Sequence, residues 1–489
     1  MSKLEQHFKK FRDNVVGIDQ EFDTPFGRKK MIYADWIASG RLYGPIEDRI
    51  REEIAPYIGN THTETTESGT LMTKAYQYAH KRIKAHVNAD ENDVIITAGS
   101  GMTGVINKFQ RILGLKSYCK TGECSFASDE DVPVVFVTHM EHHSNHTSWL
   151  ETVCDVVLLK PDEDNMVAPD NLRKELEKYK NRRVKYGAFT ACSNVTGVAP
   201  DYYELARIMH EYGGYVFLDF AGSAPYVDID MHPSDPLKRI DAVLFSPHKF
   251  LGGPGSSGVL IFNKALYNNE VPDNPGGGTV EWTDPWGGHK YIEDIEIRED
   301  GGTPGFLQAM RAALAIEVKD QMDTKNIAAR EHELVQRAFE GFSKIKGIHI
   351  LADNVKDRLG IFSFWFEDIH FNLVVKLLND RYGIQVRGGC ACAGTYGHFL
   401  LNVTPEKSKQ IIDKIMGGDL TEKPGFIRVS LHPTMTDAEL DYVINAVNEI
   451  AENHNSWGED YFYNDQNNEF FHKNEPKDKE DRIVEWFTL

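Results

Sequence analysis

Short apolar runs alternate with longer amphipathic stretches through the first three hundred residues of the chain. Apolar positions at helical spacing predict helices at residues 71–87, 107–113, 171–179 and 202–212. The short runs predict buried strands at residues 94–97, 134–138, 156–159, 188–191, 215–219, 242–246 and 259–262. This alternation is typical of a mostly parallel sheet with helices on both faces. Ligands bind such sheets at the carboxyl ends of the strands, so polar residues there are the first candidates for a site.

The pattern changes after the glycine-rich segment 301–305. A long helix is predicted from Phe306 to about Phe342, and a capping box at 436–439 predicts a last helix ending near Glu452. Between them we expect strands at 348–351, 361–366, 384–387 and 427–431 and helices at 372–380 and 406–416. This second region is predicted to be a smaller α+β domain.

Four segments follow from these patterns. We expect an N-terminal arm at residues 1–30, a large α/β domain at 31–303, a small domain at 304–454 and a tail at 455–489. The tail is acidic but rich in aromatic residues, whereas disordered tails are poor in them. We therefore expect it to dock on the body of the protein or on a partner subunit.

Composition narrows the function classes. The 489 residues include 54 Lys and Arg against 74 Asp and Glu, a net charge of −20, which argues against a nucleic-acid binder. No apolar run approaches the ~18 residues of a membrane span, and the first ten residues lack the apolar core of a signal peptide. Six cysteines are too few for a disulfide framework and fit a reducing cytoplasm.

Two residues at the ends of predicted strands are candidates for a catalytic or cofactor-binding site. Lys249 follows the strand at 242–246 and precedes a glycine-rich loop, a setting that suits a desolvated amine able to form a Schiff base. An ordinary surface lysine beside a turn is the alternative. Asp219 ends the strand at 215–219 in apolar surroundings and needs a partner, such as a pyridinium nitrogen or the N–H groups of the following turn.

Residues 99–104, Gly-Ser-Gly-Met-Thr-Gly, follow another strand and open a helix. Backbone N–H groups at a helix N-terminus, together with Ser and Thr hydroxyls, form an anion cradle. The spacing matches neither the dinucleotide fingerprint nor the nucleotide-triphosphate loop, so a single phosphate is expected. A glycine turn without a ligand is the alternative.

Together these features resemble the class V aminotransferases, fold-type-I enzymes that use pyridoxal 5′-phosphate, and in particular their group II cysteine desulfurase and selenocysteine lyase branch. The resemblance covers roughly residues 30–450. It is strongest at Glu-His-His-Ser-Asn 141–145, Ser-Asn-Val-Thr-Gly 193–197, Ser-Pro-His-Lys 246–249, Gly-Thr-Pro 302–304, Arg-Gly-Gly 387–389 and Ile-Arg-Val-Ser 427–430.

The resemblance implies roles for individual residues. Lys249 would bind the cofactor covalently and move protons at the substrate, and Asp219 would keep the pyridine nitrogen protonated. His142 would stack on the ring, although it is also explained as a histidine in a polar loop, and Asn194 would contact the ring oxygen. The phosphate would be held by residues of the cradle and of the lysine segment, namely Gly101, Met102, Thr103, Ser246 and His248.

Three further positions concern the partner and the substrate. Thr303 resembles the residue presented to the phosphate of a neighbouring subunit, which implies a homodimer. Arg428 and Arg387 match two arginines near the substrate carboxylate; Arg428 is the stronger candidate for a bidentate clamp, and surface ion pairs are the alternative. At Gly222 the family often has a glutamine, so one hydrogen bond to the ring oxygen would have to come from Ser223 or Asn194.

The loop Arg-Gly-Gly-Cys-Ala-Cys-Ala-Gly, 387–394, aligns with the active-site loop of group II desulfurases. There Cys392 falls on the nucleophile, and Cys390 replaces a histidine. A nearby arginine and flanking glycines are typical of a reactive cysteine. The alternatives are a redox or metal-binding pair, with His398 as a third ligand, and cysteines that only line the pocket. Cys119 and Cys124 lie in an apparent insertion and receive no assignment.

The sequence thus predicts a cytoplasmic, homodimeric cysteine desulfurase that contains pyridoxal 5′-phosphate. It would convert L-cysteine or selenocysteine to L-alanine, form a persulfide on Cys392 and hand sulfur to an acceptor protein, with no metal, nucleic acid or membrane involved. The alternatives are a class V aminotransferase, epimerase or C–S lyase that does not use the thiol, and a non-catalytic sulfur or metal carrier on the same fold. Neither the preferred substrate nor the acceptor follows from the sequence.

Overall fold

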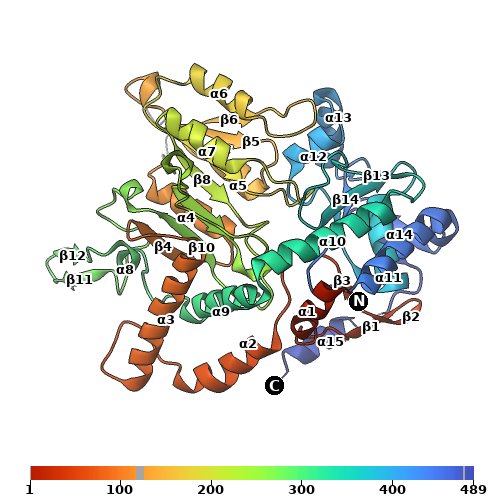
Figure 1. Ribbon diagram of the computed structural model, residues 1–489, viewed down its shortest axis with the longest axis horizontal. Helices are drawn as coiled ribbons and strands as arrows, with labels where there is room; N and C mark the ends of the chain where they lie inside the picture. Colours follow the sequence, from red (N-terminus) through yellow and green to blue (C-terminus); the bar gives the residue numbers. More distant parts are fainter. Residues whose placement is uncertain (1, 117–125, 477–478, 489) are drawn as a thin grey trace. The chain divides into compact units, whose positions relative to one another are not determined.

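The computed structural model describes residues 2–116, 126–476 and 479–488 (Figure 1). Cys119 and Cys124 lie outside these ranges. The chain forms two compact units. The first, here called the terminal unit, contains Met1–Trp36, Val195–Gly197 and Ala329–Leu489. The second, the sheet unit, contains Ile37–Asn194 and Val198–Ala328.

The sheet unit is built on a seven-stranded sheet with the order β4-β10-β9-β8-β7-β5-β6. The strands are β4 (Asp93–Ala98), β5 (Val134–Thr138), β6 (Asp155–Leu159), β7 (Lys185–Thr190), β8 (Tyr215–Asp219), β9 (Ala242–Phe245) and β10 (Gly258–Asn263). β10 is antiparallel to both of its neighbours, and the pairs from β9 to β6 are parallel. Every strand except β10 therefore runs in the same direction, which confirms the predicted α/β class.

Helices cover both faces of this sheet (Figure 1). Phe217 of β8 stacks with Trp149 and meets Phe109 edge-on at 4.9 Å between ring centroids. Its neighbours Val216 and Leu218 are also fully buried and point to the opposite face because side chains alternate along a strand. The covering helices are α4 (Met102–Ile112), α5 (His143–Leu150), α6 (Pro169–Lys178) and α7 (Tyr202–Glu211). Burial on both faces explains the nearly continuous apolar strands.

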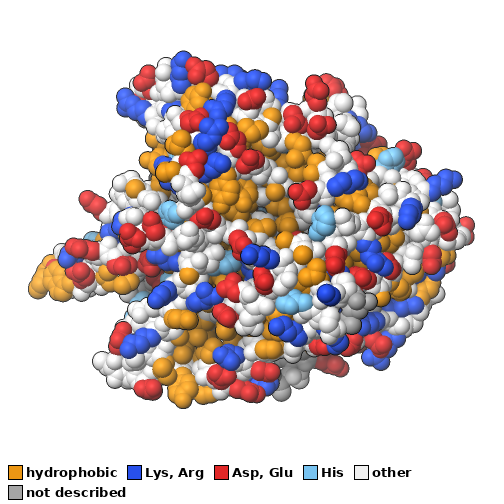
Figure 2. Space-filling model, in the orientation of Figure 1, with side chains coloured by type: hydrophobic (Ala, Val, Ile, Leu, Met, Phe, Trp, Pro, Cys, Tyr) orange, Lys and Arg blue, Asp and Glu red, His pale blue; other side chains and the backbone are white. Residues whose placement is uncertain are grey.

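The remaining elements of this unit surround the sheet. They are α2 (Gly44–Arg49), α3 (Glu67–His86), α8 (Ile295–Arg298), α9 (Phe306–Met322), β11 (Val280–Thr283) and β12 (His289–Tyr291). A π-helical segment at Ile50–Ile54 continues α2, and 3₁₀ turns lie at Ala55–Tyr57, Asp129–Asp131, Pro236–Lys238, Pro247–Lys249 and Lys264–Leu266. The hairpin β11–β12 ends in an apolar tip, visible in Figure 2, where Trp286 is 89% exposed.

The terminal unit contains a four-stranded antiparallel sheet with the order β13-β14-β17-β16. Its strands are β13 (Ile348–Ile350), β14 (Ile361–Phe366), β16 (Arg387–Gly389) and β17 (Phe426–Ser430). Paired strands beside it are β1 (Glu21–Thr24) with β2 (Gly27–Lys30), β3 (Ile32–Tyr33) with β15 (Ile384–Gln385), and β18 (Tyr461–Asn464) with β19 (Glu469–His472). The helices are α1 (Lys3–Arg12), α11 (Phe371–Tyr382), α12 (Gly394–Leu400), α13 (Pro405–Met416), α14 (Asp437–Gly458) and α15 (Lys479–Trp486).

Two predicted elements are divided in the structure. The helix expected at 306–342 is two helices, α9 and α10 (Thr324–Phe342), because Asp323 has a φ of 65° and its carboxylate accepts the N–H of Lys325. The strand expected at 384–387 is also split: β15 pairs with β3, whereas β16 pairs with β17. The capping box at Thr436 and Glu439 is confirmed as the start of α14.

The segment after α14 packs partly on its own unit. The hydroxyl of Tyr461 donates to the buried carboxylate of Asp380 at 3.1 Å, and Lys376 forms an ion pair with Glu475 at 2.7 Å. These contacts hold the hairpin β18–β19 against α11. The apolar residues of α15 and its end remain at the surface, with Trp486 68% and Phe487 84% exposed.

Among the described residues, no helix has both the length and the apolar character needed to cross a membrane.

Candidate active site

The predicted site residues of the sheet unit come from loops at one edge of the sheet. β4, β5, β7, β8 and β9 run in the same direction, so their carboxyl ends lie at the same edge. The register pairs Thr190 with Asp219 and Asp219 with Leu244, which places the ends of three strands at nearly the same level. Parallel topology therefore gathers residues that are far apart in the sequence.

Lys249 lies in a short 3₁₀ turn that begins where β9 ends. Ser246 precedes this turn with extended backbone, and Pro247 starts it, which suits the fixed φ of proline. The N–H of Lys249 donates to the Ser246 carbonyl at 3.1 Å, and the carbonyl of His248 accepts the N–H of Gly40 at 2.9 Å. The lysine is half-buried. It is thus carried by an ordered segment and not by a loose surface loop.

Asp219 is buried at the end of β8. One carboxylate oxygen accepts the N–H of Ala221 at 2.8 Å. Burial raises the pKa of Asp219 to about 6, against the smaller opposing effects of the Ala221 N–H and of the Lys249 charge. The Ala221 N–H and the Lys249 charge therefore do not compensate for the burial of the carboxylate, and a further cation beside it would favour its ionised form.

The turn after Asp219 leaves little room for a side chain at Gly222, where a Cβ would lie 3.0 Å from the carbonyl oxygen of Cys192. The hydroxyl of Ser223 is buried and has no hydrogen-bond partner among the described residues. A buried hydroxyl in this state is available to a bound molecule.

The glycine cradle at residues 99–104 is hydrogen-bonded to residues 246–249, the segment that carries Lys249. Ser246 accepts the N–H of Met102 through its hydroxyl at 2.8 Å, and Nδ1 of His248 donates to the Ser100 carbonyl at 2.8 Å. A Cβ on Gly101 would lie 3.0 Å from Cε1 of His248 and 3.1 Å from the Ser246 hydroxyl, so only glycine keeps this space open. Burial lowers the pKa of His248. Hydrogen bonds thus join the start of α4 to the residues that follow β9.

Thr103 and His142 are both hydrogen-bonded to Ser144. The hydroxyls of Thr103 and Ser144 are hydrogen-bonded at 2.6 Å, and Nδ1 of His142 accepts the N–H of Ser144 at 3.1 Å. The histidine is the N-cap of α5. Because Nδ1 accepts a backbone N–H, the proton of the neutral ring lies on Nε2. The ring orientation is therefore fixed from the helix start.

Asn194 and Thr303 occupy different surroundings. Asn194 is buried in the loop that follows β7, at the same edge of the sheet as Asp219. Thr303 is exposed, and its hydroxyl donates to Asn60 at 3.4 Å. The structure thus brings every predicted cofactor residue except Thr303 to the loops of one sheet edge.

In the terminal unit, Arg428 and Arg387 lie opposite each other on paired strands and share one carboxylate. Nη2 of Arg428 donates to Oδ1 of Asp35 at 2.8 Å, and Nε of Arg387 lies 3.3 Å from Oδ2. Arg428 is only 3% exposed, whereas half of the Arg387 side chain is exposed. Burial lowers the pKa of Arg428, and the charges of Asp35 and Cys392 oppose this effect. The two arginines form one basic group whose charge Asp35 neutralises only in part.

Cys392 is exposed at the tip of the turn that follows β16. Ala391 and Cys392 both have positive φ, 49° and 57°, and the turn is closed by the N–H of Ala393, which donates to the carbonyl of Cys390 at 3.0 Å. Cys392 follows β16 by three residues, and β16 pairs with β17, which carries Arg428. The nucleophile candidate and the carboxylate-binding candidate are therefore parts of one local structure.

Sequence reasoning missed two buried carboxylates. One is Asp35, which follows the two-residue strand β3 and forms a bridge to Ser430. The other is Glu141, which accepts hydrogen bonds from Thr138, Thr190 and Asn145 and so ties β5, β7 and α5 together. Burial raises the pKa of Glu141. Neither residue was assigned a role from the sequence: Asp35 follows a strand of only two residues, and Glu141, although part of the 141–145 motif, gave no sign that it would be buried.

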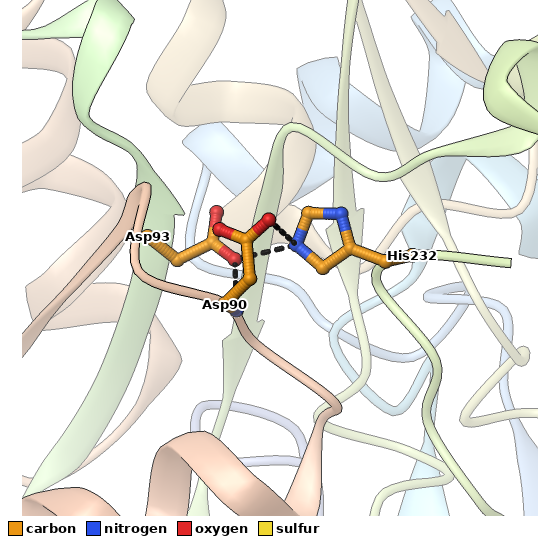
Figure 3. Close-up of side chains that lie close together, drawn as sticks. All are labelled: Asp90, Asp93 and His232. Atoms are coloured by element: carbon orange, nitrogen blue, oxygen red, sulfur yellow. Dashed lines mark hydrogen bonds and ion pairs between the residues drawn. The ribbon is translucent and has the colours of Figure 1, made fainter.

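A separate cluster in the sheet unit joins Asp90, Asp93 and His232 (Figure 3). Nε2 of His232 lies 2.6 Å from a carboxylate oxygen of the buried Asp93 and 3.8 Å from the more exposed Asp90. The same oxygen of Asp93 accepts the N–H of Asp90 at 2.9 Å. The cluster ties the start of β4 to the connection between β8 and β9, away from the carboxyl ends of the strands.

A mostly parallel sheet thus carries a lysine, a buried aspartate and a glycine-rich helix start at the carboxyl ends of its strands, the arrangement expected from the resemblance to the class V aminotransferases. A family model described as aminotransferase class-V matches residues 32–443, and the chain belongs to that family.

Curated relatives and solved structures agree with this assignment. A probable cysteine desulfurase of Halalkalibacterium halodurans is 28% identical over 380 residues, which cover 77% of this chain and 86% of that protein. Probable cysteine desulfurase 2 of Mycobacterium leprae is 27% identical over 406 residues, 81% and 92% of the two chains.

Among solved structures, an apo cysteine desulfurase from Thermococcus onnurineus NA1 matches with a TM-score of 0.71 at 21% identity and covers 91% of this chain and 98% of its own. A cysteine desulfurase from Escherichia coli, in an S-sulfonic acid form, matches with a TM-score of 0.67 at 24% identity and covers 86% and 94%. These structures share the fold of this chain.

Proposed function

We propose that the protein is a cysteine desulfurase that uses pyridoxal 5′-phosphate and carries sulfur from L-cysteine on Cys392. The observation that supports this most directly is the joint placement of Asp219, Lys249 and the glycine cradle at one edge of the parallel sheet. The curated relatives named above are described as probable cysteine desulfurases, and the exposed Cys392 supplies the thiol that such a reaction needs.

The residues of the sheet unit fit the cofactor. The carboxylate of the buried Asp219 accepts the N–H of Ala221, and burial raises its pKa, so a protonated pyridine nitrogen would be a favourable cationic partner for it. The space kept open by Gly101, beside Ser246 and the first N–H groups of α4, suits a phosphate. When bound, pyridoxal phosphate acts as an electron sink for the substrate carbon atoms.

The side chains then have separate tasks. Lys249 would hold the cofactor through its amine and afterwards carry a proton at the substrate Cα. His142, whose ring orientation is fixed by the Ser144 N–H, would pack against the cofactor ring. Asn194 and the hydroxyl of Ser223 would provide polar contacts to the ring substituents. Thr103 and His248 would complete the phosphate site.

The terminal unit would bind and attack the substrate. The planar guanidinium of Arg428 suits the substrate carboxylate, with Arg387 beside it. The Cys392 thiolate would attack the sulfur of the bound substrate. The new S–S bond forms as the C–S bond breaks, the electron pair stays with the substrate carbon, and that carbon gains a proton as alanine is formed.

Further proposals concern assembly and location. Thr303 is exposed in the sheet unit, and the tip of β11–β12 presents Trp286 to solvent, as expected for surfaces covered by a second copy of the chain. We propose a homodimer, a cytoplasmic location and an acceptor protein for the sulfur. Size-exclusion chromatography with light scattering tests the dimer.

The cofactor assignment is tested by reconstitution. The apoprotein mixed with pyridoxal 5′-phosphate should turn yellow, and borohydride reduction should attach the cofactor to the peptide that contains Lys249. The Lys249→Ala variant should remain unlabelled, while Lys264→Ala, which removes another lysine of the same unit, should label normally. An unlabelled native protein would refute the proposal.

A further inference from the structure

Cys390 and Cys392 are the first and third residues of a four-residue turn that ends at Ala393. Cys390 accepts the N–H of Ala393 at 3.0 Å through its carbonyl, and the two central residues, Ala391 and Cys392, both have left-handed backbone. Positive φ at both central positions is characteristic of a type I′ turn. In such a turn the Cα atoms of Cys390 and Cys392 lie about 5.5 Å apart, within the range found for disulfides.

The sheet holds the first cysteine in place. Cys390 directly follows β16, whose last residue, Gly389, pairs with Phe426 of β17. The Cys390 thiol is half-buried and donates to the carbonyl of Pro424 at 2.9 Å. It is therefore anchored by one weak hydrogen bond, which a rotation about χ1 breaks, while its backbone stays fixed.

The two thiols of the loop differ in their exposure to solvent. Burial raises the pKa of Cys390, the neighbouring Cys392 raises it further, and Lys423 opposes both effects. Cys390 is thus kept as a thiol while the exposed Cys392 meets the substrate.

We propose that Cys390 is a resolving thiol that releases sulfide from the persulfide on Cys392. This inference rests on the proposed function, because that reaction supplies the persulfide. The Cys390 sulfur attacks Sγ of Cys392, a Cys390–Cys392 disulfide forms, and the bond from Sγ to the outer sulfur breaks. The outer sulfur leaves with the bond's electron pair and, with the Cys390 proton, becomes sulfide. The Cys390 sulfur is oxidised from thiol to disulfide as the outer sulfur is reduced to sulfide, while Sγ of Cys392 keeps its oxidation state.

The consequence is a requirement for a reductant. Without one, each chain turns over once and stops as the disulfide. A dithiol, either a small molecule or a protein, reduces the disulfide and restores Cys392 for the next cycle. Of the four cysteines in the described part of the chain, Cys154 and Cys192 belong to the other unit, so they serve as controls.

A single-turnover experiment tests the inference. The reconstituted enzyme receives one equivalent of L-cysteine without oxygen or reductant, and the reaction is stopped with acid. The native chain should lose about 2 Da through the disulfide and release one equivalent each of alanine and sulfide. The Cys390→Ser variant, whose hydroxyl still donates to Pro424, should form the same alanine but gain about 32 Da and hold its sulfur until a dithiol is added. Cys154→Ser should match the native enzyme.

The results separate the two proposals. A native chain that gains about 32 Da and keeps its sulfur would overturn the resolving role and leave the desulfurase proposal intact. Release of as much sulfide by Cys390→Ser as by the native chain would also overturn the resolving role and leave the desulfurase proposal intact. Absence of alanine from the native enzyme would instead overturn the proposed function, and the resolving role with it. A non-reducing peptide map of the native chain shows the Cys390–Cys392 link without any variant.

Discussion

Asp35 lies between two arginines: its carboxylate accepts a hydrogen bond of 2.8 Å from Arg428 and lies 3.3 Å from Arg387. Arg428 is almost completely buried, so Asp35 is the counter-charge that makes its burial tolerable. The two guanidinium groups together exceed the single carboxylate by one positive charge, which a substrate carboxylate would neutralise.

Replacement of Asp35 should therefore weaken the fold. Asp35→Asn keeps the shape but removes the charge opposite Arg428, and we expect a loss of about 2–4 kcal/mol in the free energy of unfolding by urea. Asp19→Asn, which removes the exposed partner of Lys30 in the same unit, should change it by less than about 0.5 kcal/mol. Equal losses in the two variants would show that Asp35 does not balance Arg428.

The two arginines should differ in substrate binding. Arg428→Lys replaces a planar fork by a single ammonium, and we expect the KM for L-cysteine to rise about tenfold or more with a smaller change in kcat. Arg387→Lys should have a weaker effect, because Arg387 is half exposed. Initial rates of alanine formation measure both constants. A larger effect at Arg387 would reverse the assignment.

Asp219 should make the apoprotein sensitive to pH. Its pKa is about 6 in the folded chain, above the ordinary value of 3.8, so the folded state holds a proton that the unfolded state loses. The contribution of Asp219 to the free energy of unfolding is complete below about pH 4 and is lost as the pH rises through about 6. Asp219→Asn should therefore gain about 1–3 kcal/mol at about pH 7.5 and almost nothing at about pH 3.5, measured by urea unfolding without cofactor. An equal effect at both pH values would contradict the assignment.

Gly101 should be essential for cofactor affinity. A Cβ at this position would press on His248 and Ser246 and fill the space assigned to the phosphate. Gly101→Ala should weaken binding of pyridoxal phosphate about tenfold or more, roughly 1.4 kcal/mol, in a fluorescence titration. Gly104→Ala is the matched control, since its Cβ would meet only the Cα of Gly99 at 3.7 Å. Equal affinities in the two variants would place the phosphate elsewhere.

The sheet was predictable because its strands are buried on both faces and their apolar runs are continuous. The loops after β4, β8 and β9 were also predictable, since each begins where an apolar run stops at Gly99, Asp219 or Ser246. The division of the strand at 384–387 was not, because local patterns do not reveal which distant strand each residue pairs with.

Other parts of the site depend on tertiary contacts. The role of Asp35 arises only when β3 is brought beside Ser430, nearly four hundred residues away. The link from Thr103 through Ser144 to His142 likewise needs α4 and α5 to be neighbours. The left-handed turn at Ala391 and Cys392 has no glycine at its centre and so carried no turn signal.

The most direct test of the central claim is the fate of L-cysteine with native enzyme and Cys392→Ala, both reconstituted with pyridoxal 5′-phosphate and assayed with dithiothreitol. The native enzyme should produce equal amounts of alanine and sulfide over many turnovers. Cys392→Ala should bind the cofactor with an unchanged absorbance spectrum but lose almost all sulfide production, while Cys192→Ala stays active. Full activity of Cys392→Ala would contradict the account.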